Sequence, residues 1–455
     1  MRKQLIGVGI LIAIAALLGG CTWFGVQSIS PLASNQTRHI ELIVSGGLTD
    51  SVIAELEGYG RITKRFDEIG GVAMDVKGSA VAELAALPYV DAVADQAERH
   101  ALDYSSGIST WDQDIINITD YGVGRVVDYD GEGVYVAVLD TGLVKNWRDY
   151  LPADQVATEY AKAFSGGGST NANISEPANL WERDTNSHGT HVASSILGFS
   201  VYGFYTVNGA ATKAMVIPVK VLGNSGSGWS TIVAEGILYI ADLKESLGAP
   251  MVINMSLGGP YLSPLEQAAI DYAIDKGVIV VAAAGNSGDA GMDYPGAYAP
   301  VISVGAAGWT SEWAASGWWH GDVADPTAVG DVYVCDFSGR EKPGQDLDVL
   351  APGSWVVGPY LAYGAAHPPI WANGVPGQYY YLGGTSMATP HVAGLVALML
   401  EKDGSLDAAA VEEILEETAL PIPPGSALVA GEAFTWGSDA SGSGLVQADA
   451  ALGAL

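Results

Sequence analysis

The chain has 455 residues, of which 49% are hydrophobic and 16% charged, a composition typical of a globular protein with one large domain or two or three smaller ones. Its formal net charge is −31, from 51 acidic and 20 basic residues, which argues against nucleic acid as a partner. With only 2 cysteines, a disulfide-stapled scaffold is excluded.

The N-terminal residues have the pattern of an export signal. Two basic residues precede an apolar stretch at 5–18, which is short for a membrane-spanning helix, and two glycines then lead to Cys21. Because this arrangement resembles a bacterial lipobox, we predict a signal peptide at 1–20, lipid attachment to Cys21 and a linker at 21–37. An ordinary cleaved signal peptide and a short uncleaved anchor remain alternatives.

This signal predicts an extracytoplasmic protein whose precursor is anchored to the membrane through the lipid on Cys21. With Cys21 in that role, Cys335 is left alone, and we expect no internal disulfide. A bridge between the two cysteines is the less favoured alternative.

A small α+β block follows at 38–103, where strand-like runs such as HIELIVSG flank helical runs such as SVIAELEGYG. A hinge containing serine and glycine, YSSGIST, occupies 104–110. Because the packing pattern of the block stops there, we predict proteolytic processing at about residues 97 to 110.

From residue 111 the pattern changes to apolar strands separated by helices. Helical runs begin near His188, Trp229 and Pro264, and the strand-like runs occupy 134–140, 214–222, 251–259, 277–286 and 301–307. Apolar strands that alternate with helices predict an α/β fold, a mainly parallel sheet with helices on both faces. Ligands bind beyond the carboxyl ends of such strands, so polar residues at these ends are candidates for a site.

Four polar residues stand at such positions. Asp140 ends a strand in VAVLDTG, His188 begins a helical run in SHGTHVASSILG, Asn286 follows a strand in AAAGNSG, and Ser386 precedes an apolar helix in GGTSMATPHVAG. Taken singly, each residue is more often a turn or cap residue. Together they supply a nucleophile, its base, an orienting carboxylate and an oxyanion donor, the parts needed for acyl transfer.

These four motifs resemble those of the subtilisin-like serine proteases, in the chain order of that family. The resemblance implies that Ser386 is the nucleophile, His188 the general base and then acid, and Asp140 the carboxylate that orients the imidazole. Asn286 is implied to donate to the oxyanion beside the backbone N–H of Ser386. The catalytic domain then fills 111–455, and catalysis needs no cofactor.

The resemblance also implies a binding groove for polypeptide substrates. SLGG and AAG are similar to the two walls of the primary specificity pocket, and GSG to the strand edge that pairs with an extended peptide. No acidic cluster is evident in these runs, so we expect a broad preference that tolerates bulky apolar side chains rather than dibasic specificity. The substrate-binding residues implied are Gly226, Ser227, Gly228, Ser256, Leu257, Gly258, Ala284 and Gly285.

The block at 38–103 resembles the inhibitory propeptide of the family, which makes the protein a zymogen and its own propeptide a partner. An independent binding module is the alternative interpretation of this block. If Cys21 carries the lipid, cleavage after the propeptide leaves the anchor with the inhibitor. Maturation then also releases the protease as a secreted enzyme.

Structural calcium is common in this family, and Asp149, nine residues after Asp140, matches a ligand position there, with Gln113 as a candidate companion. His191 and His391 are interpreted as packed, structural side chains. The aromatic-rich stretches between Asn286 and Ser386 are interpreted as an insertion packed onto its domain, in preference to an extended substrate groove.

The leading hypothesis is an exported, lipid-anchored zymogen of a serine endopeptidase. A catalytically silent surface binding protein of the same fold is one alternative, and it predicts no labelling by a fluorophosphonate probe. A dedicated maturation protease for one partner protein is another, and it predicts no degradation of casein.

Overall fold

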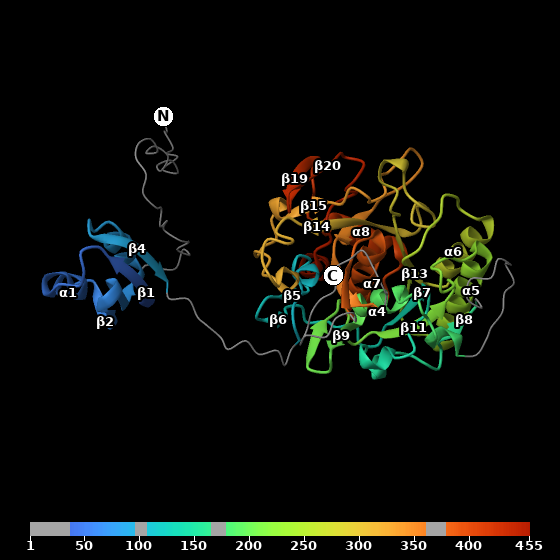
Figure 1. The fold of residues 1–455 in the computed structure, drawn as a ribbon, viewed down its shortest axis with the longest axis horizontal. Helices are drawn as coiled ribbons and strands as arrows, with labels where there is room; N and C mark the ends of the chain where they lie inside the picture. The colour runs from blue at the N-terminus through green and yellow to red at the C-terminus, as the bar shows by residue number, and fades with distance from the viewer. Residues whose placement is uncertain (1–36, 96–106, 165–178, 361–378) are drawn as a thin grey trace, which may run out of the picture. The chain divides into compact units, whose positions relative to one another are not determined.

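The structure is a computed structural model that describes residues 37–95, 107–164, 179–360 and 379–455 (Figure 1). The chain divides into two compact units, Met1–Ala101 and Leu102–Leu455. The predicted signal peptide, Cys21 and residues 104–106 of the predicted hinge lie outside the described residues. Within the described ranges, no helix has the length and apolar character needed to cross a membrane.

The first unit contains a four-stranded antiparallel sheet in the order β2-β3-β1-β4. Alternate residues of β1 are buried, so one face of the sheet packs with the helices around Leu42, Leu56, Met74 and Leu84. The elements are β1 (Thr37–Val44), α1 (Asp50–Glu57), β2 (Gly60–Phe66), β3 (Gly71–Lys77), α2 (Val81–Ala85) and β4 (Val90–Asp95).

The second unit is built on an eight-stranded sheet in the order β15-β14-β13-β12-β7-β11-β8, with β16 also paired to β14. Every pair in it is parallel except β14 with β15. The strands are β7 (Tyr135–Asp140), β8 (Lys162–Ala163), β11 (Met215–Lys220), β12 (Met251–Met255), β13 (Ile279–Ala283), β14 (Ile302–Trp309), β15 (Val332–Val334) and β16 (Val349–Pro352). The mainly parallel α/β fold predicted from the sequence is therefore confirmed.

Helices cover both faces of this sheet, as Figure 1 shows around the labels α4, α7, α5 and α6. In β7, Val136 and Val138 belong to the core shared with α4 and α7, whereas Ala137 and Leu139 belong to the core shared with α5 and α6. Because successive side chains point to opposite faces and both faces are covered, the strand is apolar almost throughout. The helices are α4 (His188–Leu197), α5 (Ser230–Leu247), α6 (Pro264–Asp275) and α7 (Thr385–Lys402).

Shorter elements complete the second unit around the sheet. Four antiparallel pairs connect or flank the larger elements: β5 (Thr119–Asp120) with β6 (Gly124–Arg125), β9 (Gly198–Val201) with β10 (Tyr205–Asn208), β17 (Val356–Pro359) with β18 (Tyr379–Leu382), and β19 (Gly425–Val429) with β20 (Glu432–Trp436). The remaining α-helices are α3 (Trp111–Asp114), α8 (Ala408–Thr418) and α9 (Ala448–Gly453).

Candidate active site

Asp140 and His188 form a hydrogen-bonded pair at the edge of the sheet where β7 ends and α4 begins. The Nδ1 atom of His188 lies 2.9 Å from each carboxylate oxygen of Asp140. Asp140 has no exposed surface, and its Oδ1 also accepts the backbone N–H of Thr141 at 2.6 Å. This buried carboxylate therefore fixes the imidazole so that Nδ1 carries the proton and Nε2 is free to act as a base.

Opposing effects act on the pKa of His188. Burial lowers the pKa, but the charge and hydrogen bond of Asp140, together with the charge of Asp184, raise it further, so the net shift is upward. An imidazole of raised pKa is a stronger base. It accepts a proton only while neutral, which requires a pH above that raised pKa.

Ser386, the second residue of α7, exchanges two hydrogen bonds with Ser256. Pro390 has no N–H to offer the carbonyl four residues before it, so the Ser386 carbonyl is free to accept the Ser256 hydroxyl at 2.8 Å. The Ser386 hydroxyl in turn donates to the Ser256 carbonyl at 3.2 Å. Ser256 thus fills the place of a missing helical donor and fixes the start of α7.

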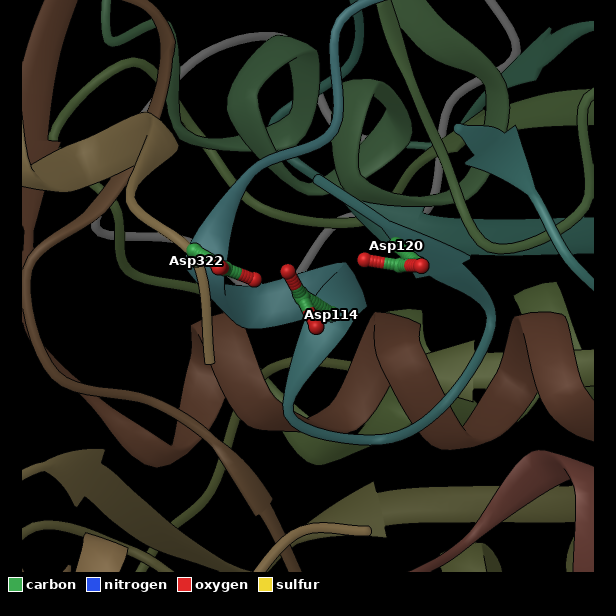
Figure 2. Close-up of side chains that lie close together, drawn as sticks. All are labelled: Asp114, Asp120 and Asp322. Atoms are coloured by element: carbon green, nitrogen blue, oxygen red, sulfur yellow. The ribbon is translucent and has the colours of Figure 1, made fainter. Parts of the chain in front are cut away.

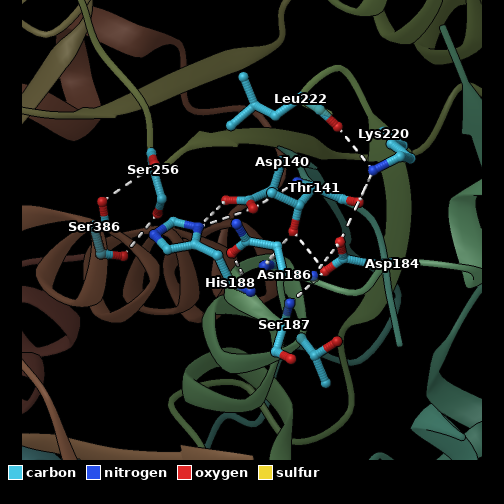
Figure 3. A network of polar contacts seen from close by, with 12 residues as sticks. Asp140, Thr141, Asp184, Asn186, Ser187, His188, Lys220, Leu222, Ser256 and Ser386 are labelled. Carbon is cyan, nitrogen blue, oxygen red and sulfur yellow. Dashed lines mark hydrogen bonds and ion pairs between the residues drawn. The ribbon is translucent and has the colours of Figure 1, made fainter. Parts of the chain in front are cut away.

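The imidazole of His188 lies between Asp140 and Ser386 (Figure 3). His188 and Ser386 both line one cleft of about 530 Å³. The Ser386 hydroxyl donates to Ser256 and not to the imidazole. Rotation of the serine side chain redirects the hydroxyl, and hydrogen bonds of this kind often form fully only with substrate in place.

Asn286 is oriented by its contacts with Thr385. Its Oδ1 accepts both the backbone N–H of Thr385, at 2.9 Å, and the Thr385 hydroxyl, at 3.1 Å. With two donors at Oδ1, the Nδ2 group must point the other way. A Cβ placed on Gly384 would lie 3.6 Å from Asn286 Nδ2 and 3.7 Å from the Ser386 backbone nitrogen, so both N–H donors border the same space.

Six of the eight residues assigned to substrate binding line the cleft that contains Ser386: Gly226, Ser227, Gly228, Ser256, Leu257 and Gly258. Ala284 and Gly285 are buried and do not line it. The Ala284 carbonyl accepts the backbone N–H of Asp293 at 2.8 Å, and Gly285 lies against the side chain of that aspartate.

A buried network behind Asp140 was not predicted from the sequence (Figure 3). Asp184 accepts the backbone N–H groups of Asn186 and Ser187 at 2.9 and 2.7 Å and the hydroxyl of Thr141 at 2.8 Å. Thr141 also accepts the backbone N–H of Gly189 at 3.0 Å. The network therefore joins the strand end that carries Asp140 to the loop and helix that carry His188.

Lys220, the last residue of β11, completes this network. Its ammonium lies 3.9 Å from Asp184 and donates to the carbonyls of Thr141 and Leu222, the latter at 2.8 Å. Burial raises the pKa of Asp184 and lowers that of Lys220, and the charge of each partner opposes the shift of the other. A lysine at the end of an apolar strand is the sequence signal that could have indicated this pair, whereas its parallel register with Asp140 is seen only in the structure.

The two other histidines of the motifs are fully buried. His191 Nε2 lies 3.2 Å from the Val356 carbonyl, and burial lowers the pKa of His191 to about 3, so the ring is neutral. His391 is held on both sides, with Nδ1 2.8 Å from the Met387 carbonyl and Nε2 2.9 Å from Asp112.

Asp149 and Gln113, assigned to calcium from the sequence, have different surroundings. Asp149 is exposed and accepts the amide of Asn146 at 3.1 Å. Gln113 is buried in α3, where its amide lies 3.4 Å from Asp112 and from the Ser195 carbonyl. Among the described residues, no hydrogen bond or ion pair connects the two.

A different group of carboxylates converges beside α3 (Figure 2). One oxygen of each of Asp114, Asp120 and Asp322 lies within 4.8 Å of the others. Asp114 is 1% exposed, and its Oδ1 has no hydrogen-bond partner. Burial raises the pKa of Asp114 to about 8 against the lowering effect of the hydrogen bond from the Val323 backbone, and the charges of neighbouring aspartates raise it further. Carboxylate oxygens are the ligands that a hard divalent cation prefers.

The described aromatic residues of the predicted insertion pack against one another. Trp318 stacks on Tyr381 with ring centroids 5.2 Å apart, and Trp313 contacts both rings at 4.9 and 5.3 Å. Trp371 lies outside the described residues. None of these three described rings lines the cleft at Ser386, so their contacts agree with a packing role.

Comparisons with known proteins indicate the family to which this chain is similar. The model of the subtilase family matches residues 131–447. Thermitase from Thermoactinomyces vulgaris is 34% identical over 290 residues, covering 64% of this chain and 82% of thermitase. Subtilisin E from Bacillus subtilis is 30% identical over 374 residues, covering 80% of this chain and 79% of subtilisin E. The solved structure of sphericase has a TM-score of 0.54 at 31% identity, covering 74% of this chain and 97% of sphericase.

Proposed function

The chain belongs to the subtilase family and is a serine endopeptidase of that family, and we propose that it cleaves polypeptides through an acyl-enzyme formed on Ser386. The observation that carries this proposal is the position of His188, between the buried carboxylate of Asp140 and the serine at the start of α7. The arrangement supplies a base with an oriented, accessible Nε2 next to a hydroxyl.

In the first half of the reaction, the Ser386 oxygen attacks the peptide carbonyl carbon while His188 Nε2 takes the hydroxyl proton. The C–N bond then breaks, and the imidazolium gives that proton to the leaving amine. In the second half, His188 activates a water molecule that hydrolyses the ester and restores the serine. The buried charge of Asp140 stabilises the imidazolium that forms in each half.

The negative charge on the carbonyl oxygen is stabilised by two N–H donors. The backbone N–H of Ser386 is one of the free donors at the start of α7, and Asn286 Nδ2 borders the same space. Thr385 holds the Asn286 amide before substrate arrives, so little reorganisation is needed as the charge develops.

A fluorophosphonate probe tests the nucleophile directly. We expect the probe to label the activated protein and the Ser246→Ala control, whose exposed serine lies on α5, and not the Ser386→Ala variant. Degradation of casein by the same preparations then separates a general endopeptidase from a protease dedicated to one partner. Unlabelled wild-type protein that is correctly folded would instead support a silent binding protein.

We propose that the small domain predicted at 38–103, which contains nearly all of the described part of the first unit, is an inhibitory propeptide that the enzyme removes. Its own sheet and core support a separately folded domain. The match to subtilisin E covers 80% of the chain, more than the second unit contains, so part of it lies in the first unit. We expect the Ser386→Ala protein to stay at full length while the wild type loses the first unit.

Lipid on Cys21 is proposed to hold the precursor on the membrane, so that removal of the propeptide also releases the protease. Fractionation of cells that express the wild type or Ser386→Ala tests this. We expect the mature wild-type enzyme in the soluble fraction and the uncut variant on washed membranes. A mature enzyme that stays on the membrane as firmly as the variant contradicts the proposal.

A structural calcium ion is proposed for the second unit, with no part in the chemistry. Asp114, Asp120 and Asp322 fit such an ion because all are oxygen ligands and Asp114 Oδ1 has no other partner. On binding, the ion would neutralise their mutual repulsion and tie α3 to the loop that carries Asp322.

Thermal unfolding of full-length Ser386→Ala protein, with calcium and with EDTA, tests this site. We expect calcium to raise Tm, and we expect the Asp114→Asn substitution to remove most of that increase. Asp289→Asn, at a side chain 99% exposed, serves as the control. A calcium effect that survives Asp114→Asn and disappears in Asp149→Asn would move the ion to the position first suggested by the sequence.

A further inference from the structure

Asp293 stands between the two backbone segments that were assigned as walls of the specificity pocket. Its backbone N–H donates to the Ala284 carbonyl at 2.8 Å, on the segment that follows β13. The next residue, Tyr294, lines the cleft and exchanges hydrogen bonds of 2.7 and 2.8 Å with Gly259, on the segment that follows β12. The aspartate is therefore fixed by main-chain bonds to both segments.

The Asp293 side chain lies against the Cα atoms of both wall glycines. A Cβ added to Gly258 would lie 2.8 Å from Asp293 Cβ, and a Cβ added to Gly285 would lie 2.5 Å from Asp293 Oδ2. Glycine at these two positions therefore makes room for a carboxylate. The sequence resemblance implies that this room takes a substrate side chain and that no acidic cluster lines the pocket.

No hydrogen bond or ion pair holds the Asp293 carboxylate within the described part of the chain. The residue is half-buried, and burial alone raises the pKa of its carboxyl group. A partly desolvated carboxylate with no partner is costly to keep charged, and a cation that reaches it recovers that cost. Among the described residues, no lysine or arginine supplies this cation, which leaves a bound ligand as its source.

The adjoining cleft favours a positively charged guest. Its lining contains no lysine or arginine among the described residues, so nothing there repels a cation. The lining contains one carboxylate, Glu266, which is 7% exposed, and Asp293 lies behind the lining residue Gly258. The net charge of −31 also attracts basic polypeptides at long range.

We propose that this endopeptidase prefers lysine or arginine immediately before the scissile bond, and that Asp293 is the residue that determines the preference. The inference rests on the proposed function, since it concerns the pocket next to Ser386 in the same cleft. Asp293 takes no part in bond breaking. It forms an ion pair with the ammonium or guanidinium of the substrate and so holds the scissile carbonyl at the nucleophile.

A series of fluorogenic peptides that differ only at this position tests the preference. Norleucine is the uncharged counterpart of lysine, and citrulline is the uncharged counterpart of arginine. We expect kcat/KM for lysine and arginine to exceed that of their neutral counterparts by about 10- to 100-fold, the range of one partly desolvated charged contact. Equal rates for charged and neutral members would overturn the proposal and leave the endopeptidase function intact.

Two variants assign the preference to one residue. Asp293→Asn and Asp293→Ser should bring the charged-to-neutral ratio close to one while the norleucine peptide is still cleaved. Asp289→Asn, a nearby exposed position, should keep the wild-type ratio. If both Asp293 variants keep that ratio, another group determines it. If wild-type enzyme cleaves no peptide and resists the fluorophosphonate, the proposed function itself fails.

Discussion

Asp184 and Asp293 belong to loops that border the candidate active site, and their surroundings are opposite. Asp184 accepts three hydrogen bonds at 2.7 to 2.9 Å and faces the ammonium of Lys220. The Asp293 carboxylate has no hydrogen bond or ion pair among the described residues, although burial raises the pKa of both carboxyl groups. A carboxylate with its bonds satisfied inside the protein positions its neighbours, whereas one left unpaired at a cleft is available to a ligand.

Asn286 combines both situations in one side chain. Its Oδ1 is occupied by Thr385, and its Nδ2 borders the space next to the Ser386 backbone nitrogen. We expect the contacts of Oδ1 to hold the side chain in position, and we expect Nδ2 to stabilise the negative charge on the reacting oxygen. Substitutions can test whether satisfied polar groups support the structure and free ones act on ligands, in order from the largest expected effect to the smallest.

Among these substitutions, replacement of Asp184 is expected to cause the largest loss in the free energy of unfolding of the second unit. Asp184→Ala leaves the ammonium of Lys220 buried without its counter-ion and three donors without an acceptor, at a cost of about 3 to 5 kcal/mol in the free energy of unfolding. Urea unfolding in the Ser386→Ala background measures it, with Asp154→Ala as the exposed control. A loss below about 1 kcal/mol would mean that Asp184 is not a structural support.

Replacing Asn286 should damage turnover and leave stability nearly unchanged. Asn286→Ala removes the free Nδ2 donor, and kcat should fall about 100- to 1,000-fold with little change in KM, the size known for the equivalent donor of subtilisin. Thr385→Val keeps the backbone N–H that Asn286 accepts but removes the hydroxyl, which also accepts the Gly285 backbone N–H at 3.1 Å, so we expect about a 10-fold loss in kcat. Steady-state kinetics and thermal unfolding of the same samples separate the two effects.

The pH profile of kcat/KM should show that the charge of Asp184 raises the pKa of His188. Because the pKa of His188 is raised, kcat/KM should fall as the pH decreases through a value above the ordinary one for histidine. The groups that set this pKa are Asp140 and Asp184, with the neutral ring of His191 nearby. Asp184→Asn removes one negative charge, so the acidic limb should move to lower pH. An unmoved limb would contradict this contribution.

The smallest effect is expected on the free energy of unfolding when Asp293 is replaced and no substrate is present. Its folded-state pKa is raised, so its contribution to stability is present at low pH and is lost as the pH rises through that pKa. Asp293→Asn removes this dependence and should change the free energy of unfolding at pH 7 by about 1 kcal/mol or less, toward greater stability. Unfolding at pH 4 and pH 7 measures it, and a strong destabilisation would assign Asp293 a structural role.

The sequence alone determined the fold class and the placing of polar residues along it. Apolar strands alternate with helices from residue 111 onward, and Asp140, His188 and Ser386 follow from that pattern as residues at strand ends or helix starts. Such patterns are local, because burial on both faces makes a strand apolar and the start of a helix leaves N–H groups free. They can be recognised in the sequence without knowing which distant segments are in contact.

Only the tertiary structure decided which of these groups are satisfied and which are free. Lys220 meets Asp184 because β11 lies beside β7 and Thr141, which follows β7, is hydrogen-bonded to Asp184. Asp293 reaches Gly258 and Gly285 because the ends of β12 and β13 are adjacent. The hydroxyl of Ser386 rests on Ser256 for a similar reason, across 130 residues of sequence. Hydrogen-bond satisfaction depends on contacts between residues far apart in the chain, and local composition carries no record of them.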